Sequence, residues 1–494
     1  MNSQAEAEMQ QTHDATTTMH FIDGRWQPSA SGKVVHTYSP STGARLAAIA
    51  EGDRIDAQAA IAAARRGFKS LARLTRWERA RLCFRIADEV ERRSDELSRV
   101  LAMEQGKPLE AEARGEVAAA ATGFREAGEL IKWMEGEFIP VETPGKRVIS
   151  YRQARGVYAV ITPWNFPINI PVEYLAPCLA AGNAVVWVPA PTTSLCAAML
   201  MECIAAADLP NGAVNLVFGP GAVVGDEIVA DPGTDGIGFT GSARTGGLIA
   251  QRGAGKPMLL ELGGNGPVVV LDDADLDRAA EAAAFGSFFN AGQVCAASGR
   301  ILVTERSYDA LSEKIAAIAG KVRLGDPLDP STTMGPLNNA MVATKVDEHV
   351  ADGLARGAEL LVGGNRSPEL GSELFYKPTV LGRVPVEALL NSAETFGPVA
   401  PIVVCSDEAD LLATANAASH GLAASVFTRD LGRAFAFGEN LTAGLVNINS
   451  ASCYWELHLP FGGAAGKQSG IGRLGGKHSL REVTDIKTIT FDIS

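Results

Sequence analysis

The sequence contains few cysteines, and none of them are paired at metal-binding spacing. Its 494 residues include seven cysteines, an odd number, scattered without a C-x-x-C pair. This pattern argues against a disulfide framework and a zinc cluster, and it is typical of a reducing compartment. We therefore predict a cytoplasmic protein that binds no metal.

Positive charge and long apolar runs are also scarce. The formal net charge of -13 argues against a nucleic acid or an anionic membrane surface as partner. No segment has the apolar length of a transmembrane helix. Residues 1–18 contain no Lys or Arg and no apolar core, which predicts a terminal tail rather than a signal or transit peptide.

Helical and strand patterns alternate along most of the chain. Apolar residues recur at helical spacing from about Ile55 to Trp133, and apolar strands then alternate with helices. This order predicts an α/β protein of two or three domains with doubly wound parallel sheets. The segments 146–156 and "DIKTITFDI" near the C-terminus fit neither sheet, and we expect these two strands to pair as a protruding arm.

Two glycine-rich turns follow strands in the first block, at 218–225 and 239–246. The N–H groups at a helix start bind pyrophosphate well, and Ser242 is a natural N-cap residue. Neither turn has the strict G-x-G-x-x-G pattern, so each alone is more often an ordinary strand-to-helix turn.

Two polar residues lie in unusual apolar surroundings. Asn165 stands between two prolines in "ITPWNFP", where its carboxamide would stabilise an oxyanion or only shape the loop as an Asx-turn. Glu261 stands in "LLELGGNGP", where burial would raise its pKa and make it a general base. The alternative for Glu261 is a structural hydrogen bond to the backbone of Gly263 and Gly264.

Cys295 lies among small residues in "NAGQVCAASGR". A free cysteine is more often a small buried hydrophobe than a nucleophile, because a thiol must be activated before it reacts. The segment alone therefore favours the structural interpretation.

Six segments occur in the order "PWNFP", "FTGS", "ELGG", "GQVC", "ETFGPV" and "LPFGG". In this combination the chain resembles the NAD(P)-dependent aldehyde dehydrogenase superfamily, from "FIDGRW" near the start to "PFGG" near the end. The resemblance implies a Rossmann-like cofactor-binding domain (19–132 and 154–261) and an α/β catalytic domain (262–460). It also implies a small β oligomerisation arm (133–153 and 478–494), and hence a homodimer or homotetramer.

The resemblance implies a role for each motif residue. Cys295 would attack a small-molecule aldehyde, Asn165 would hold the oxyanion, and Glu261 would activate the water that hydrolyses the thioester to a carboxylic acid. NAD or NADP would contact Thr162, Pro163, Trp164, Gly221, Gly225, Phe239, Gly241, Ser242, Gly263, Glu394 and Phe396. The substrate tunnel would include Phe166, Glu173, Tyr174, Cys453, Tyr454 and Trp455.

The chain departs from the family pattern in two places. Val188 and Pro191 replace the Lys and Glu that usually bind the adenosine ribose, and without a cation for a 2′-phosphate we favour NAD slightly over NADP. Glu173 and Tyr174 replace an aromatic–Lys pair. Tyr174 would then act as a hydrogen-bond donor, and Glu173 either disfavours anionic aldehydes or is a salt-bridged surface residue.

Two other functions are compatible with the fold. A CoA-acylating relative would transfer the acyl group to CoA, but Glu261 argues against this function because the CoA-dependent relatives lack a general base at that position. A non-catalytic binding protein would not need the intact set of Cys295, Glu261 and Asn165. The sequence does not identify the aldehyde.

Overall fold

The computed structural model describes residues 17–494, and these residues form four β-sheets. The tail expected over 1–18 lies outside the described residues except for its last two. Of these, Thr18 already bridges to Ile49.

The larger sheet has eight strands in the order β19-β11-β10-β7-β8-β9-β1-β2. Its parallel strands are β7 (Val157–Ile161), β8 (Ala184–Val188), β9 (Val214–Leu216), β10 (Gly236–Gly241) and β11 (Met258–Leu262). The antiparallel strands are β1 (His20–Ile22), β2 (Arg25–Gln27) and β19 (Gly470–Ile471). Because β7 lies between β8 and β10, the strand order reverses at β7, and ligands bind at the carboxyl ends of strands at such a switch point.

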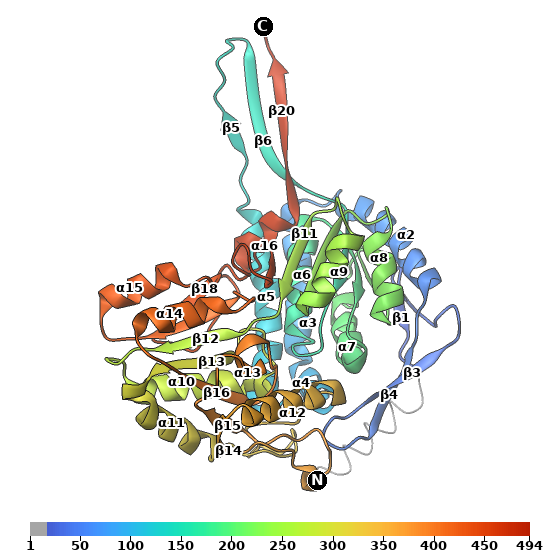
Figure 1. Cartoon of the computed structure of the whole chain (residues 1–494). Helices are drawn as coiled ribbons and strands as arrows, with labels where there is room; N and C mark the ends of the chain where they lie inside the picture. Colours follow the sequence, from blue (N-terminus) through green and yellow to red (C-terminus); the bar gives the residue numbers. More distant parts are fainter. Residues whose placement is uncertain (1–16) are drawn as a thin grey trace.

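Helices cover this sheet on both faces (Figure 1). The helices of this lobe are α2 (Arg54–Leu71), α3 (Arg76–Arg92), α4 (Ser94–Gln105), α5 (Arg114–Lys132), α6 (Asn169–Ala181), α7 (Ser194–Ala205), α8 (Asp226–Ala230) and α9 (Ala243–Arg252), of which α3 and α5 pack on α6. The helical region predicted from about Ile55 to Trp133 is confirmed. Capping boxes at Asp53 and Thr75 start its first two helices, since each side chain accepts a hydrogen bond from a helical N–H.

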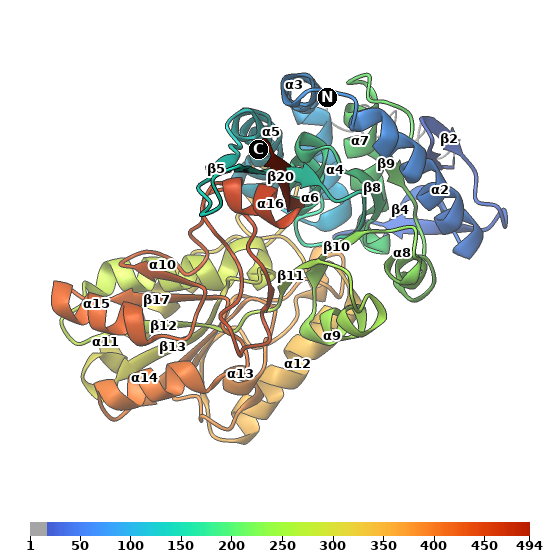
Figure 2. The ribbon, with the colours of Figure 1, turned by 90° about the horizontal axis from the view of Figure 1, so that it is seen from above.

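The second sheet has seven strands in the order β14-β15-β16-β13-β12-β17-β18. Its strands are β12 (Gly266–Val270), β13 (Ser298–Thr304), β14 (Glu359–Val362), β15 (Thr379–Gly382), β16 (Val399–Cys405), β17 (Ala423–Phe427) and β18 (Leu445–Ile448). The helices around it are α10 (Leu276–Phe288), α11 (Glu305–Ala319), α12 (Ala340–Ala355), α13 (Leu389–Ser392), α14 (Glu408–Ala417) and α15 (Leu431–Asn440). Each large sheet has its own apolar core, and the two lobes lie side by side (Figure 2).

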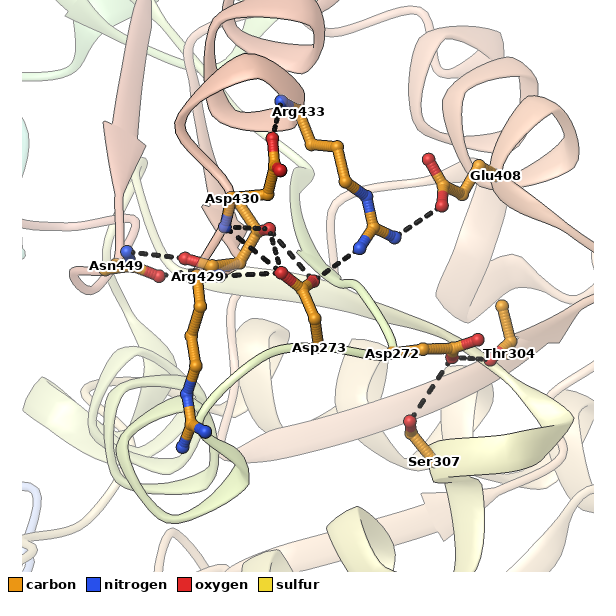
Figure 3. A network of polar contacts seen from close by, with 10 residues as sticks. Asp272, Asp273, Thr304, Ser307, Glu408, Arg429, Asp430, Arg433 and Asn449 are labelled. Carbon is orange, nitrogen blue, oxygen red and sulfur yellow. Dashed lines mark hydrogen bonds and ion pairs between the residues drawn. The ribbon is translucent and has the colours of Figure 1, made fainter.

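A polar network links the carboxyl ends of β12 and β17 in the second sheet (Figure 3). Asp273, just after β12, accepts hydrogen bonds from the Thr428 hydroxyl at 2.8 Å and from the N–H of Arg429 at 3.0 Å. It also forms an ion pair with Arg433 at 2.6 Å, and Arg433 in turn contacts Glu408 of α14. One carboxylate therefore joins β12 to the segment between β17 and α15.

The third sheet projects away from both lobes (Figure 1). It consists of β5 (Glu137–Ile139), β6 (Lys146–Ala154) and β20 (Thr484–Asp492), and β20 runs antiparallel to β6 along its whole length. The predicted pairing of these two segments is confirmed. Residues 478–482, placed in the arm by the predicted boundary, belong instead to α16 (Gly476–Glu482), which packs on α5 and α6.

The fourth sheet is a hairpin of β3 (Val34–Tyr38) and β4 (Arg45–Ala50). No helix within residues 17–494 is long and apolar enough to cross a membrane.

Candidate active site

Cys295 lies between the short 3-10 turn η4 (Phe289–Gly292) and the start of β13. Just before it, Asn290, Ala291 and Gly292 have φ values of 49°, 52° and 71°. Residues other than glycine rarely adopt this conformation, and such strain persists only where surrounding contacts fix it. Those contacts are present, because the Asn290 N–H donates to Glu112 and its side-chain oxygen accepts from Gln105, both at 3.0 Å.

The segment that joins the two large sheets passes directly against the Cys295 backbone. A Cβ at Gly264 would lie 2.1 Å from the Cys295 carbonyl oxygen, so only glycine allows this approach. The close approach brings the end of β11, and with it Glu261, beside Cys295.

Glu261 is buried, and burial raises its pKa to about 8, with a smaller upward contribution from the nearby Glu394 carboxyl. Cys295 and Thr240 act in the opposite direction and lower the pKa of this carboxyl group. Its Oε1 atom has no hydrogen-bond partner within residues 17–494. The alternative prediction was a structural hydrogen bond from the glycine backbone to Glu261. The Gly264 N–H does not make this bond, because it donates to Glu394 Oε1 at 2.9 Å.

The Cys295 thiol is surrounded by acidic side chains. Burial raises its pKa well above the ordinary value, and Glu261, Glu394 and Glu173 raise it further. A thiol in such surroundings is protonated at neutral pH. It must therefore lose its proton to a neighbouring base before it attacks.

Asn165 follows β7 and is buried. Its Nδ2 donates to the Gln293 carbonyl at 3.0 Å, across the site, and its own carbonyl accepts from Asn290 Nδ2 at 2.9 Å. These bonds reach the Cys295 segment rather than forming a local Asx-turn. Because an amide nitrogen carries two hydrogens, the second one remains for a substrate oxygen.

Lys107 contacts the backbone of Asn165, and the sequence did not predict this contact. Its fully buried ammonium group forms an ion pair with Glu116 and donates to the Asn165 carbonyl at 3.0 Å. Glu116 also accepts from the N–H groups of Ile168 and Asn169, at 2.9 and 3.1 Å, where α6 begins. The loop that holds Asn165 is therefore fixed by a buried ion pair.

The carboxyl ends of β7 and β10 carry several of the residues predicted to bind the cofactor. The predicted N-cap is confirmed, since Ser242 begins α9 and its hydroxyl accepts from Thr245 N–H at 3.3 Å. Trp164 and Phe396 contact each other edge to face, with ring centroids 5.6 Å apart. Gly221 and Gly225 are the first and last residues of a π-helical turn, η3 (Gly221–Gly225). Apart from its own neighbours along the chain, no atom of residues 17–494 lies within 4 Å of the position that a Cβ would take at Gly221. A helix N-terminus, an open glycine turn and an aromatic pair are each features that a dinucleotide site uses.

Other predicted cofactor residues have internal contacts. Thr162 accepts from the Trp187 indole N–H at 2.8 Å, and the Phe239 ring is buried in β10. A Cβ at Gly263 would lie 2.7 Å from a Glu394 carboxylate oxygen. The sequence did not suggest Lys345, whose ammonium lies 5.9 Å from the centroid of the Phe396 ring. Burial raises the pKa of Glu394, and the positive charge of Lys345 opposes this rise.

Three predicted tunnel residues, Phe166, Cys453 and Trp455, are half-buried against the first core. The Phe166 ring lies 6.0 Å from that of Phe289, an aromatic residue that the sequence did not single out. Tyr454 is 48 % exposed and donates to Glu456.

The remaining two tunnel candidates, Glu173 and Tyr174, point in different directions from α6. Tyr174 does not line an open wall: it is 1 % exposed, and its hydroxyl bonds to β10. Glu173 is half-buried, accepts from Asn169 Nδ2 at 3.0 Å and has no ion pair with a Lys, Arg or His in the described part of the chain. The surface salt bridge that was the alternative for Glu173 is therefore not formed.

The site combines a thiol beside a buried carboxyl, a carboxamide across from it, and strand ends of the kind that bind dinucleotides. Together these features define a class of enzyme. This class is the nicotinamide-dependent oxidoreductases that oxidise a carbonyl group through a covalent cysteine intermediate.

Comparison with known proteins agrees with this class. The model of the aldehyde dehydrogenase family matches residues 26–489. The NADP-dependent succinate-semialdehyde dehydrogenase of Escherichia coli is 39% identical over 469 residues, which are 94% of this chain and 96% of that protein. The crystal structure of betaine aldehyde dehydrogenase from Staphylococcus aureus in complex with NAD+ matches with a TM-score of 0.95 and 32% identity, over 99% of this chain and 98% of that chain.

A succinate-semialdehyde dehydrogenase from Burkholderia pseudomallei matches with a TM-score of 0.94 and 37% identity, over 96% of this chain and 98% of that chain. The chain belongs to the aldehyde dehydrogenase family. It is an NAD(P)-dependent, non-acylating enzyme that oxidises an aldehyde to a carboxylic acid.

Proposed function

We propose that Cys295 is the nucleophile, Asn165 the oxyanion donor and Glu261 the base of this oxidation. The Cys295 sulfur, after its proton has passed to a neighbouring base, bonds to the aldehyde carbon, and the new oxyanion accepts from Asn165 Nδ2 and the Cys295 N–H. NAD(P)+, when bound, supplies the acceptor for the hydride that leaves this carbon. Ser242, Glu394, Trp164 and Phe396 are the residues we expect to hold it.

The thioester left on Cys295 is then hydrolysed. Glu261 takes a proton from a water whose oxygen bonds to the carbonyl carbon, the carbon–sulfur bond breaks, and the acid leaves. The observation that carries this proposal is the buried Glu261 carboxyl beside Cys295, with one oxygen free of hydrogen bonds within residues 17–494.

Rapid mixing with excess NAD+ and aldehyde tests these roles. The C295A variant should form no reduced cofactor. The E261Q variant should form no more than about one equivalent per subunit and then stop, because the thioester that forms is not hydrolysed. Steady turnover by C295A would refute the nucleophile, and full turnover by E261Q would refute the base.

For the cofactor we propose a preference for NAD over NADP. A cavity of about 490 Å³ borders the carboxyl ends of β8 and β9, where Pro191 and Thr192 lie. Its lining includes the acidic Glu51 and no Lys or Arg, and the Ser194 hydroxyl is occupied by the Pro191 carbonyl. Besides the imidazole of His36, a 2′-phosphate there would meet a carboxylate and no Lys or Arg. We expect kcat/KM to be higher with NAD+ than with NADP+. The E51K variant should reduce the difference between these two values. A wild-type preference for NADP+ would contradict the proposal.

For the substrate we propose a neutral or cationic aldehyde. Burial and the nearby carboxyls of Glu261 and Glu116 raise the Glu173 pKa well above its usual range, and no described cation offsets them. An anionic substrate would add a further negative charge to this acidic site, whereas a cation would stabilise ionised Glu173.

Three aldehydes of similar length separate the possibilities: succinate semialdehyde, butanal and 4-trimethylammoniobutanal. We expect the lowest kcat/KM for succinate semialdehyde, and a selective gain for it in E173Q. Preferred use of succinate semialdehyde by the wild type would refute the substrate class while leaving the reaction intact.

We further propose a cytoplasmic homodimer or homotetramer assembled through the arm. The seven cysteines are all free thiols, which suits a reducing compartment. The arm exposes the strand edges of β5 and β20, together with Phe138, Ile486 and Phe491, and exposed strand edges favour pairing with another chain.

A further inference from the structure

A chain of three buried side chains leads from Glu261 into the interior. Thr240 and Glu261 are paired residues of the parallel strands β10 and β11, so the Thr240 hydroxyl and the Glu261 carboxyl project from the same face of the sheet, and Thr240 lowers the pKa of this carboxyl against the effect of burial. The Tyr174 hydroxyl lies 2.7 Å from Thr240 Oγ1 and 3.0 Å from the Phe239 carbonyl oxygen. Tyr174, Thr240 and Glu261 are only 1%, 5% and 3% exposed.

The Tyr174 ring is held in place by the packing of α6 on β10. A Cβ at Gly238 would lie 2.5 Å from Tyr174 Cδ1, so the ring occupies the space that any other residue at 238 would fill. The hydroxyl is therefore presented to Thr240 by a fixed ring rather than by a mobile side chain.

The chain can support Glu261 in both protonation states. When Glu261 is ionised, Tyr174 donates to Thr240 and Thr240 donates to the carboxylate. When Glu261 is protonated, it donates to Thr240, Thr240 donates to Tyr174, and Tyr174 donates to the Phe239 carbonyl. In each state every hydroxyl hydrogen has an acceptor.

The hydrogen-bond chain matters because no positively charged group interacts directly with Glu261 within residues 17–494. Among the described residues, the titratable groups that interact with it are Cys295, Glu394, Glu173 and Tyr174, and none of these four is a cation. Lys345 is associated with Glu394. Neutral hydroxyl donors therefore provide the stabilisation that a nearby cation would otherwise give to the carboxylate.

We propose that Thr240 and Tyr174 are positioning residues that hold Glu261 in its basic, ionised form for thioester hydrolysis. This inference rests on the proposed role of Glu261. Beyond that role, a hydrogen-bond chain whose donors and acceptors can reverse sets the pH range in which Glu261 acts as the base.

The test uses p-nitrophenyl acetate, which acylates a reactive thiol directly, so that deacetylation is measured without cofactor or aldehyde. The burst of p-nitrophenolate reports acylation of Cys295, and the steady rate from pH 6 to 10 reports hydrolysis. The variants are T240V, Y174F and the conservative T240S. Y158F is the matched control, because Tyr158 is equally buried and its hydroxyl bonds to Arg155 and to the Glu482 carbonyl instead.

We expect T240V to lower the deacetylation rate at pH 7 by about tenfold, the effect of losing a charge-assisted hydrogen bond to the ionised base. Y174F should lower it by about threefold, since it only weakens the Thr240 donor. In both variants the rate should recover at higher pH, because the pKa of Glu261 rises. T240S and Y158F should keep the wild-type pH profile.

An equal loss at every pH in T240V and Y174F, or a wild-type profile in Y174F, would overturn the inference and leave Glu261 as the base. Persistence of the burst in C295A would instead refute the assignment of Cys295 on which the inference rests.

Discussion

Replacement of Lys107 by Met should both destabilise the protein and slow the reaction. The substitution leaves the Glu116 carboxylate buried without its cation and leaves the Asn165 carbonyl with one donor fewer. Breaking a buried ion pair by removing one partner costs about 3–5 kcal/mol. This is a large part of the roughly 5–15 kcal/mol that holds a typical protein folded.

The double variant K107M/E116Q separates the buried charge from the lost packing. The glutamine side chain that replaces Glu116 retains an oxygen that can accept from the N–H groups of Ile168 and Asn169, and it carries no charge. We therefore expect the double variant to be more stable than K107M alone by about 1–3 kcal/mol. The exposed pair Arg92–Glu89 is the control, and R92A should change stability by less than about 1 kcal/mol.

Urea unfolding followed by tryptophan fluorescence, at several protein concentrations because of the expected assembly, measures these differences. Single-turnover formation of reduced cofactor measures the effect on Asn165, and a misplaced oxyanion donor should slow this step in K107M by about a hundredfold. Wild-type stability in K107M, or a double variant no more stable than K107M, would refute the reasoning.

Three further outcomes can be tested on other contacts of the structure. Hydrolysis of the thioester should rise about tenfold per pH unit up to about pH 8 and level off above it, because ionised Glu261 is the base; a flat single-turnover profile would contradict this. D273A should lower the free energy of unfolding by about 2–4 kcal/mol, since it removes the acceptor of two N–H groups and the partner of Arg433; an unchanged urea midpoint would contradict this. Deletion of residues 485–494 should reduce the assembly to smaller particles in light scattering after size exclusion, and an unchanged mass would remove the arm from the interface.

The arm and the nucleophile segment could be predicted because their signals are local. The segments that become β6 and β20 both alternate in polarity and have no partner in either large sheet, so their pairing was the simplest solution. Cys295, Glu261 and Asn165 were found because each lies in a short motif, and the structure brings all three together.

Residues that act through tertiary contacts were not predictable in this way. Lys107 follows the end of a helix in an ordinary "QGKP" segment, and only the fold places its ammonium group under Asn165. Tyr174 was expected in the tunnel from the family resemblance, because it stands where the family has an aromatic–Lys pair, and the pattern of α6 gives no indication of a preferred face. Eleven of its thirteen residues are buried, so the sequence could not show which side meets β10.

The central claim is that Cys295 carries the acyl group until Glu261 releases it. The most direct measurement is peptide mass spectrometry of E261Q after brief reaction with NAD+ and the best aldehyde of the panel. We predict that the peptide with Cys295 carries the mass of the acyl group, that wild type treated in the same way carries far less, and that C295A carries none. Formation of reduced cofactor by E261Q without any added mass on Cys295 would contradict the account.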